Sequence, residues 1–367
     1  MKQSRSSNSH NPSKEGGSRS HRDLRSRWLG LIVLLALVAF PFILALLTGQ
    51  PVTAGTPKFW QGMLIQVFIL AVYAMSYDLM LGYTGILSFG HAMFFGVGAY
   101  ATGILLKHAG WSLGPTALLV VGVAIVLALL IGVVSLRVRG VYFAMATLAF
   151  AGMFFILVQA TDFRDITGAE DGLHAIPVPA WLNPTNERLT FYFVALAFCV
   201  VMYLIARRVV DSPPGRVMVA IRENEARTQV IGFNTFVYKL LAVTLAGTMA
   251  ALAGLMNALW NLNATPDVFN VETTINALLM TIIGGVGTLI GPMLGAGVLQ
   301  LLGYWLNDIF GPRWPLLIGV VYILLVLFLP YGIVGTWQMR RNDIRAGWRR
   351  LLQPLRTGTE SSPRGKS

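Results

Sequence analysis

Two ionisable side chains lie within long apolar stretches of this sequence, where a charge is costly to keep. Asp78 stands near the end of the apolar run 59–81, and His91 lies in the stretch Ser-Phe-Gly-His-Ala among small residues. An aspartate at the centre of a membrane-spanning helix costs about 2.5–3.5 kcal/mol on insertion scales. Each side chain therefore has two interpretations. It lines a polar path between helices, or it forms a hydrogen bond that holds two helices together.

Motifs for catalysis and for metal or nucleotide binding are missing from the sequence. It contains no His-Glu-x-x-His pair and no Gly-x-Ser-x-Gly turn, and its five histidines are scattered. The single cysteine, Cys199, offers neither a thiolate metal site nor an intramolecular disulfide. The terminal Gly365-Lys366-Ser367 has Glu360 where a phosphate-binding loop needs its first glycine. We therefore expect no enzyme activity and no cofactor bound by this chain; if ATP drives it, ATP and Mg²⁺ bind to another subunit.

The composition requires a membrane. Of the 367 residues, 55% are hydrophobic and only 12% are charged, whereas soluble domains carry about 25% charged residues. Many apolar runs approach the roughly 20 residues that cross a bilayer. We expect an all-α polytopic membrane protein with about ten transmembrane or re-entrant helices, at residues 28–47, 59–81, 86–106, 113–136, 141–160, 189–206, 236–260, 273–288, 289–307 and 315–333.

The sequence leaves two topologies for the run 273–307. Five of its residues favour a break in the helix: Gly284, Gly285, Gly287, Gly291 and Pro292. A broken helix survives in a membrane where protein or water satisfies the freed backbone groups. The segment either crosses twice or enters and leaves on one side. The glycine spacing of 82–98 resembles that of 284–297 and suggests an internal repeat.

The ends of the chain are polar and basic. Residues 1–27 are expected to form a disordered cytoplasmic tail, followed by the membrane domain 28–335 and a second basic tail, 336–367. A cleaved signal peptide is the alternative for the first run, but no small-x-small cleavage site follows it convincingly. With the N-terminus inside, 23 of the 28 Lys and Arg residues fall on the cytoplasmic side. This bias favours two cytoplasmic termini.

Two connections are long enough to form surfaces, the outer loop 161–188 and the basic inner loop 207–235. In the inner loop, Ser212 followed by two prolines predicts a helix start, and Gly232 predicts its end. Val217, Ala220 and Ile221 are expected to form its apolar face. Glu223 and Arg227 have the spacing of a helical ion pair. This single amphipathic helix either rests on lipid headgroups or docks into a groove of a partner protein.

Four ordered motifs resemble the M-type permeases of branched-chain amino-acid ATP-binding-cassette transporters. The first is Gly82-Tyr-Thr-Gly-Ile-Leu-Ser-Phe-Gly-His91, continued by Phe-Gly-Val-Gly-Ala-Tyr100. Two more are Leu136-Arg-Val-Arg-Gly-Val-Tyr-Phe-Ala-Met-Ala-Thr-Leu-Ala-Phe150 and Gly284-Gly-Val-Gly-Thr-Leu-Ile-Gly-Pro292. The fourth is the inner loop from Gly215 to Gly232, with Asn-Glu-Ala at its centre. The similarity spans roughly residues 30–335, and Thr167–Leu173 also resembles the family's outer loop.

The resemblance implies a permease subunit of an importer in the bacterial inner membrane. The expected partners are a second related permease, two cytoplasmic ATPase subunits, an extracytoplasmic solute-binding protein and lipid, with no nucleic acid. Branched-chain amino acids are the default cargo, with urea, short amides or aromatic acids as alternatives. The expected ATPase-coupling residues are Gly215, Arg216, Ala220, Ile221, Glu223, Glu225, Ala226 and Gly232. The candidate path residues are Asp78, Tyr83, Ser88, His91, Gly284 and Gly285.

Two other classes of protein are alternatives to the importer. An ion-coupled transporter or channel would need a charged network within the membrane, for which the sequence offers Asp78 and His91. A membrane-embedded enzyme would need a catalytic pair, and the sequence shows none.

Overall fold

The computed structural model describes residues 16–328 and 332–336 and forms two compact units, Met1–Gln61 and Gly62–Ser367. In the first unit, α1 (Gly16–Thr48) contains Pro41 within its apolar part. The expected disordered tail is thus wrong for residues 16–27, which are helical. An existing helix extends into polar residues without a new nucleation step, and no proline interrupts this stretch. Residues 1–15 and 337–367, the rest of the two expected tails, lie outside the described residues.

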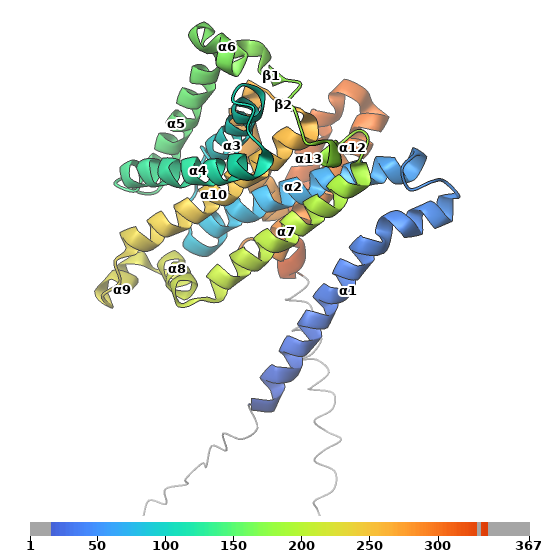
Figure 1. Ribbon diagram of the computed structural model, residues 1–367. Coiled ribbons are helices and arrows are strands. Elements are labelled where there is room, and N and C mark those ends of the chain that lie inside the picture. The colour runs from blue at the N-terminus through green and yellow to red at the C-terminus, as the bar shows by residue number, and fades with distance from the viewer. Residues whose placement is uncertain (1–15, 329–331, 337–367) are drawn as a thin grey trace, which may run out of the picture. The chain divides into compact units, whose positions relative to one another are not determined.

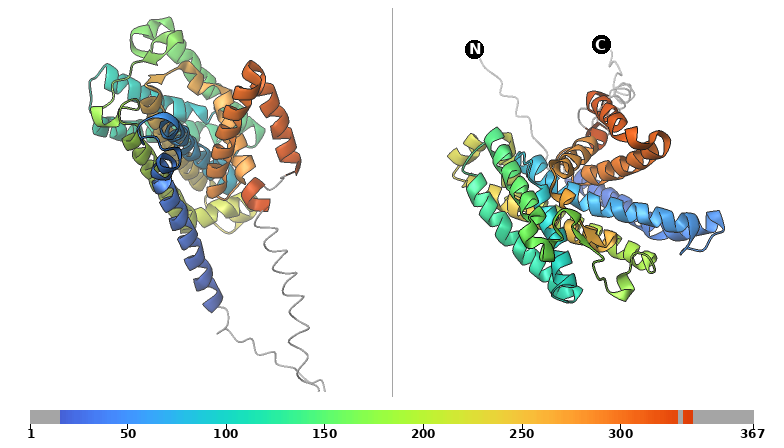
Figure 2. Two further views of the ribbon diagram at one scale, coloured as in Figure 1. Left: turned by 90° about the vertical axis from the view of Figure 1, so that its right-hand side faces the viewer. Right: turned by 90° about the horizontal axis from the view of Figure 1, so that it is seen from above.

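Each of the ten apolar runs overlaps a helix, which confirms the fold class. Beside α1, these helices are α2 (Gly55–Thr84), which begins in the first unit, α3 (Ala92–Lys107), α4 (Leu113–Ser135), α5 (Val141–Gln159), α7 (Arg188–Asp211), α10 (Thr235–Asn261), α11 (Val271–Gly284), α12 (Ile290–Phe310) and α13 (Trp314–Phe328). Seen from above, α12 and α13 lie on one side of the second unit and α4 and α5 on the other (Figure 2).

Six of the described helices are long and apolar enough to cross a membrane: α2, α4, α5, α7, α10 and residues 30–48 of α1. Leu118, Val126 and Leu130 of α4 are more than half exposed, as expected for side chains that face lipid tails. By contrast α11 has 14 residues, which rise only about 21 Å. The pair α11–α12 therefore turns within the protein at residues 285–289, as the glycines of this segment predicted.

Glycine allows the closest helix contacts in the second unit. A side chain at Gly254 of α10 would strike the Phe95 carbonyl of α3, and one at Gly98 of α3 would strike the Ala251 carbonyl of α10. Gly295 of α12 approaches the Met280 carbonyl of α11 in the same way. Close backbone approach through small residues is the usual basis of helix association in membranes.

The two long loops lie at opposite ends of the second unit (Figure 1). The loop 161–188 forms the short elements η2 (Thr161–Phe163), α6 (Arg164–Thr167), η3 (Ala169–Asp171), β1 (Leu173–His174) and η4 (Ala180–Leu182). Strand β1 pairs antiparallel with β2 (Asn263–Ala264), and η5 (Pro266–Phe269) leads into α11. At the other end the chain forms α8 (Pro213–Glu223) and α9 (Glu225–Val230).

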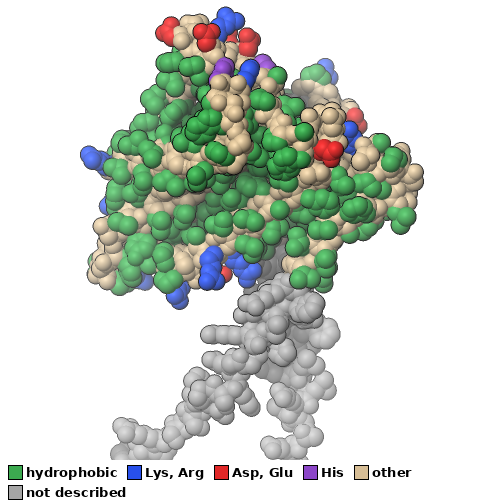
Figure 3. Space-filling view, viewed as in Figure 1, with side chains coloured by type: hydrophobic (Ala, Val, Ile, Leu, Met, Phe, Trp, Pro, Cys, Tyr) green, Lys and Arg blue, Asp and Glu red, His purple; other side chains and the backbone are tan. Residues whose placement is uncertain are grey.

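Charged side chains gather at these ends, and a broad band of hydrophobic side chains separates them on the face shown in Figure 3. The acidic residues Asp162, Asp165, Glu170 and Asp171 are exposed at the α6 end. Arg216, Arg222 and Arg227 belong to α8 and α9 at the other end. A hydrophobic band between two polar ends is the surface that a multi-pass membrane protein presents to the bilayer.

Candidate functional site

Helix α8 begins where the sequence predicts and packs directly against the end of α7. The Ser212 hydroxyl accepts a hydrogen bond from the Gly215 amide at 3.4 Å, and two prolines occupy the first positions of the helix. A Cβ at Gly215 would strike the carbonyls of Val209 and Val210. Gly215 therefore permits the tight turn that lays α8 across the end of the bundle.

The buried face of α8 differs from the expected one. Gly215, Met218 and Ile221 are buried, whereas Ala220 is exposed and Val217 is half-buried. These buried residues follow a three-residue spacing, because the contact of Gly215 with α7 sets the rotation of the helix. The exposed Arg216, Ala220 and Glu223 are therefore on the side that remains accessible to a partner.

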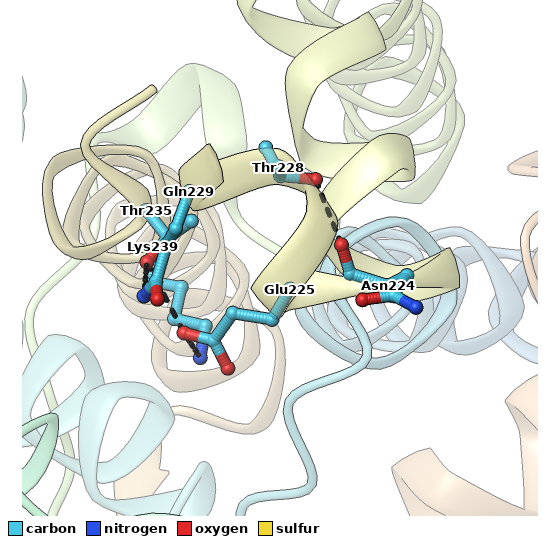
Figure 4. Close-up of polar contacts among 6 residues, drawn as sticks. All are labelled: Asn224, Glu225, Thr228, Gln229, Thr235 and Lys239. Atoms are coloured by element: carbon cyan, nitrogen blue, oxygen red, sulfur yellow. Dashed lines mark hydrogen bonds and ion pairs between the residues drawn. The ribbon is translucent and has the colours of Figure 1, made fainter. Parts of the chain in front are cut away.

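A break at Asn224 divides the expected single helix into α8 and α9. Asn224 has an extended backbone, with φ of −161°, and its side-chain oxygen accepts the Arg227 amide at 2.9 Å. Its carbonyl accepts the Thr228 hydroxyl at 2.9 Å (Figure 4). Glu223 and Arg227 consequently belong to different helices, so the expected helical ion-pair spacing does not apply. Asn224 caps the new helix, a role that asparagine commonly has.

Glu225 ties α9 to the start of α10. Its carboxylate lies 2.7 Å from the Lys239 ammonium and accepts the Thr235 hydroxyl at 3.1 Å, while Gln229 donates to Thr235 at 2.9 Å (Figure 4). Burial raises the pKa of this carboxyl, but the Lys239 hydrogen bond and charge, with Thr235 and Arg139, outweigh burial and lower the pKa below its ordinary value. The ionised pair thus joins two elements through a mainly buried contact.

Gly232 shapes the turn between α9 and α10. Its φ is +100°, a backbone conformation that residues with a side chain rarely adopt, although the space around it is open. Val230 and Ile231 beside it are 88% and 68% exposed. The turn therefore presents an apolar tip, and neighbouring Ala226 is exposed as well.

A cleft of about 310 Å³ lies between this turn and the connection from α4 to α5. The sequence did not point to this cleft, since its lining comes from separate stretches of the chain: Leu136, Arg139, Glu225, Gln229, Phe233, Asn234, Thr235, Phe236 and Lys239. Both connections belong to the family-like motifs described above, Leu136–Phe150 and Gly215–Gly232. The structure brings them together at one end of the protein.

The Asp78 side chain is buried and binds the turn between α11 and α12. One carboxylate oxygen accepts the Gly287 amide at 2.7 Å, and the other accepts the Leu289 amide at 3.2 Å. Gly284 packs against the Gly291 carbonyl, and Gly285 has φ of +120°. Asp78, Gly284 and Gly285 thus meet at one break in the helices, as freed amides in a membrane require a partner.

His91 lies in a second buried cluster on α2 and α3. Its Nε2 atom is 2.8 Å from the Ser76 hydroxyl, and its ring stacks on Tyr73 at 5.5 Å between centroids. Because Ser76 donates its proton to the Tyr73 carbonyl at 2.6 Å, it accepts from His91, which makes Nδ1 an acceptor. Nδ1 has no hydrogen-bond partner among the described residues.

Ser88 and Tyr83 occupy the same broken region at the end of α2. The Ser88 carbonyl accepts the Tyr77 hydroxyl at 2.9 Å, and its own hydroxyl accepts the Gly90 amide at 3.3 Å. Tyr83 is buried. Within residues 16–328 and 332–336, no group of three or more His, Cys, Asp or Glu side chains could hold a metal ion. The path assignment of these residues stays a prediction.

Comparison with known proteins gives one matching family model, described as "Branched-chain amino acid transport system / permease component", over residues 60–329. The high-affinity branched-chain amino acid transport system permease protein LivM of Escherichia coli K12 is 27% identical over 83% of this chain and 74% of its own. A probable LivM of Methanocaldococcus jannaschii is 25% identical over 72% of this chain and 89% of its own. The ribose import permease protein RbsC of Haemophilus influenzae is 27% identical over 44% and 47%. No solved structure matches the chain.

Proposed function

The chain belongs to the family of permease components of branched-chain amino acid transport systems, and on that premise we propose that it passes branched-chain amino acids through the membrane as one pore-forming subunit of an ATP-driven importer. The cargo is proposed from the relatives: similarity to the LivM proteins of Escherichia coli and Methanocaldococcus jannaschii covers 83% and 72% of the chain, whereas that to the ribose permease covers 44%. Urea or short amides are the alternative cargo, since related permeases share these motifs.

One observation carries the mechanism: α8 and α9 are joined to the helix bundle at both ends by specific contacts. Gly215 fixes α8 to α7, and the Glu225–Lys239 pair fixes α9 to α10. A segment held in this way moves as a body with the helices it joins. We propose that the ATPase subunits bind here and that their closure, driven by ATP and Mg²⁺ bound to them, displaces α7 and α10 through α8 and α9.

The exposed residues of α8 and α9 supply the docking surface in this proposal. Arg216, Ala220, Glu223 and Ala226 lie on the accessible side, next to the cleft lined by Arg139 and Phe233. Mixed charge beside apolar groups suits a protein groove better than lipid headgroups, which would favour basic residues alone. Docking on a partner is therefore preferred to the headgroup alternative for this segment.

The orientation follows from the basic residues. We propose that the α8–α9 end faces the cytoplasm of a bacterial inner membrane, with both termini on that side. The acidic end formed by 161–188 then faces outward and receives a loaded solute-binding protein. The four exposed carboxylates Asp162, Asp165, Glu170 and Asp171 of this loop give that protein charged groups to recognise.

The path for the solute is proposed along α2, α3, α11 and α12, where Tyr83, Ser88, His91, Gly284 and Gly285 lie. The unpartnered Nδ1 of His91 is a buried acceptor there. An ion-coupled transporter fits less well, because the Asp78 carboxylate is already bound by two amides. Such a transporter needs a carboxylate that is free to exchange a proton or cation.

The test is uptake of radiolabelled leucine into proteoliposomes that contain the complex purified with its companion subunits. We expect uptake to need ATP in the ATPase compartment and the binding protein on the opposite side. Urea and ribose in excess should not compete with leucine. Uptake by this chain alone, without an ATP-hydrolysing companion, would overturn the proposal.

A further inference from the structure

We propose that Arg222 and Asp78 are positioning residues that link α8 to the break between α11 and α12, so that displacement of α8 moves this break. This inference rests on the proposed function, and it assigns Asp78 a mechanical role in place of direct contact with the solute. The link runs from the Arg222 guanidinium through the end of α2 to the amides of Gly287 and Leu289.

The first half of the link is the Asp78 carboxylate. Asp78 is fully buried, and each of its oxygens accepts one amide of the turn, Gly287 at 2.7 Å and Leu289 at 3.2 Å. Leu289 has φ of +53°, a strained conformation for a residue with a side chain. The two hydrogen bonds offset that strain, so the shape of the turn depends on the position of Asp78.

The second half of the link is the Arg222 guanidinium. Arg222 donates a hydrogen bond to the Gly82 carbonyl, and this bond joins α8 to α2. Gly82 lies four residues after Asp78, on the same face of α2. Arg222 is also two residues before the break at Asn224, so it sits where the partner is expected to act on α8.

The two halves meet at Gly287. A Cβ on Gly287 would lie 2.8 Å from Arg222 Nη1 and 3.1 Å from the Gly82 carbonyl oxygen. A Cβ on Gly82 would lie 2.6 Å from the Gly287 amide nitrogen and would overlap the Asp78 carboxylate. The Gly287 backbone thus excludes a side chain at Gly82, and the φ of +79° at Gly287 disfavours one there. Three elements far apart in sequence touch at this point. A contact packed in this way transmits displacement, because little space remains for side chains to absorb it.

Further contacts tie α11 to both α2 and α3. The Thr281 hydroxyl of α11 lies 3.2 Å from the Ala74 carbonyl of α2, and the Thr274 hydroxyl of α11 accepts the amide of Ala92, the first residue of α3, at 2.9 Å. The broken segments 85–91 and 285–289 are therefore both anchored to these three helices. Movement of the Arg222 anchor reaches both candidate path segments.

The decisive experiment follows amide hydrogen exchange of residues 284–290 in the purified complex, without nucleotide and with ATP trapped. We expect a nucleotide-dependent change in the wild-type complex and its loss in Arg222→Gln. Arg137→Gln, which removes an exposed positive charge at the same end of the protein, should keep the change. Retention of the full change in Arg222→Gln would overturn the inference.

Transport assays provide a second, independent result. We expect Arg222→Gln and Asp78→Asn each to lower leucine transported per ATP hydrolysed by about tenfold, within the range of allosteric coupling energies. The double variant should be no worse than the more impaired single variant, because both changes break one link. Losses that multiply in the double variant would contradict a shared link, as would a raised KM for leucine with an unchanged ratio.

The two proposals fail separately. Wild-type uptake that does not need ATP refutes the proposed function itself. ATP-dependent uptake in the wild type with a normal ratio in both variants refutes the link alone. If Asp78→Asn does not fold, Arg222→Lys still tests the link, because it changes an exposed position and retains the positive charge. We expect it to give a smaller fall in the ratio than Arg222→Gln.

Discussion

The Glu225 carboxylate lies 2.7 Å from the Lys239 ammonium, and both side chains are largely shielded, at 26% and 16% exposure. The pair connects α9 to the second turn of α10, across the turn at Gly232. Thr235 adds a hydrogen bond to the same carboxylate oxygen. An ion pair reinforced by a hydroxyl and partly removed from water gives a firmer connection than an exposed pair, whose contribution is near zero.

Removing one partner of this pair should destabilise the end of the protein. We expect Glu225→Gln to lower the free energy of unfolding by about 1.5–3 kcal/mol, the range for a hydrogen bond to a charged group. Lys239→Met should cost a similar amount, and the double variant less than the sum. Thermal inactivation midpoints of the detergent-solubilised chain measure these differences. Additive losses would show that the two side chains do not interact.

The same pair predicts a pH dependence. The pKa of Glu225 is lowered from its ordinary value of 4.5, so its stabilisation is fully present above that value and is lost as the pH falls through the lowered pKa. The difference in thermal midpoint between wild type and Glu225→Gln should be constant from about pH 7 to about pH 5 and shrink towards about pH 3. A difference that persists unchanged at the lowest pH would contradict the assignment.

The effect of a substitution at Gly232 should depend on how readily the new residue adopts a positive φ, and not on the size of its side chain. Gly232→Val should strain the turn by about 1–3 kcal/mol and lower ATP-dependent uptake. Gly232→Asn should be milder, because asparagine adopts positive φ more readily. Gly152→Ala is the control, since Gly152 lies in α5 with open space around it and an ordinary φ. Equal uptake in Gly232→Val and Gly152→Ala would remove the turn from the mechanism.

The glycine contacts between α3 and α10 should be intolerant of even one methyl group. Gly254→Ala forces the two backbones apart at the Phe95 carbonyl, and overpacking of this kind costs about 1–3 kcal/mol or more. Gly122→Ala in α4, where nothing lies within 4 Å, should leave the yield of folded protein unchanged. Fluorescence-detected size-exclusion chromatography of both variants measures that yield. Comparable monodisperse peaks would refute the close approach.

The helices could be predicted from the sequence because a long apolar run indicates a helix within the membrane, although run length did not show that α3 and α11 are too short to cross it. The predicted run 113–136 became α4 at Leu113–Ser135, and Ser212 with its prolines marked the start of α8 as expected. These features depend on neighbours in the chain. The turn at Gly232 was predictable for the same reason, since glycine is the residue that positive φ requires.

The break at Asn224 and the partners of Asp78 were not predictable in this way. Residues 221–227 contain no glycine or proline to mark a break, so they read as one continuous helix, whereas the structure gives Asn224 an extended backbone and makes it the cap of α9. Asp78 was noticed as a costly buried charge, but its amide donors lie 209 and 211 residues away. Arg222 belonged to a recognised motif, and only its contact with Gly82 distinguishes it from the other arginines of the loop.

Site-specific cross-linking tests the central claim most directly, namely that α8 and α9 receive the force of ATP hydrolysis from a partner. In a Cys199→Ser background, a photoreactive group is attached through Ala226→Cys, and separately through Glu170→Cys at the opposite end. We predict that Ala226→Cys captures the ATPase subunit in the intact complex, in a manner that depends on nucleotide, and that Glu170→Cys does not. Capture of the ATPase from Glu170→Cys, with none from Ala226→Cys, would contradict the mechanism and reverse the proposed orientation.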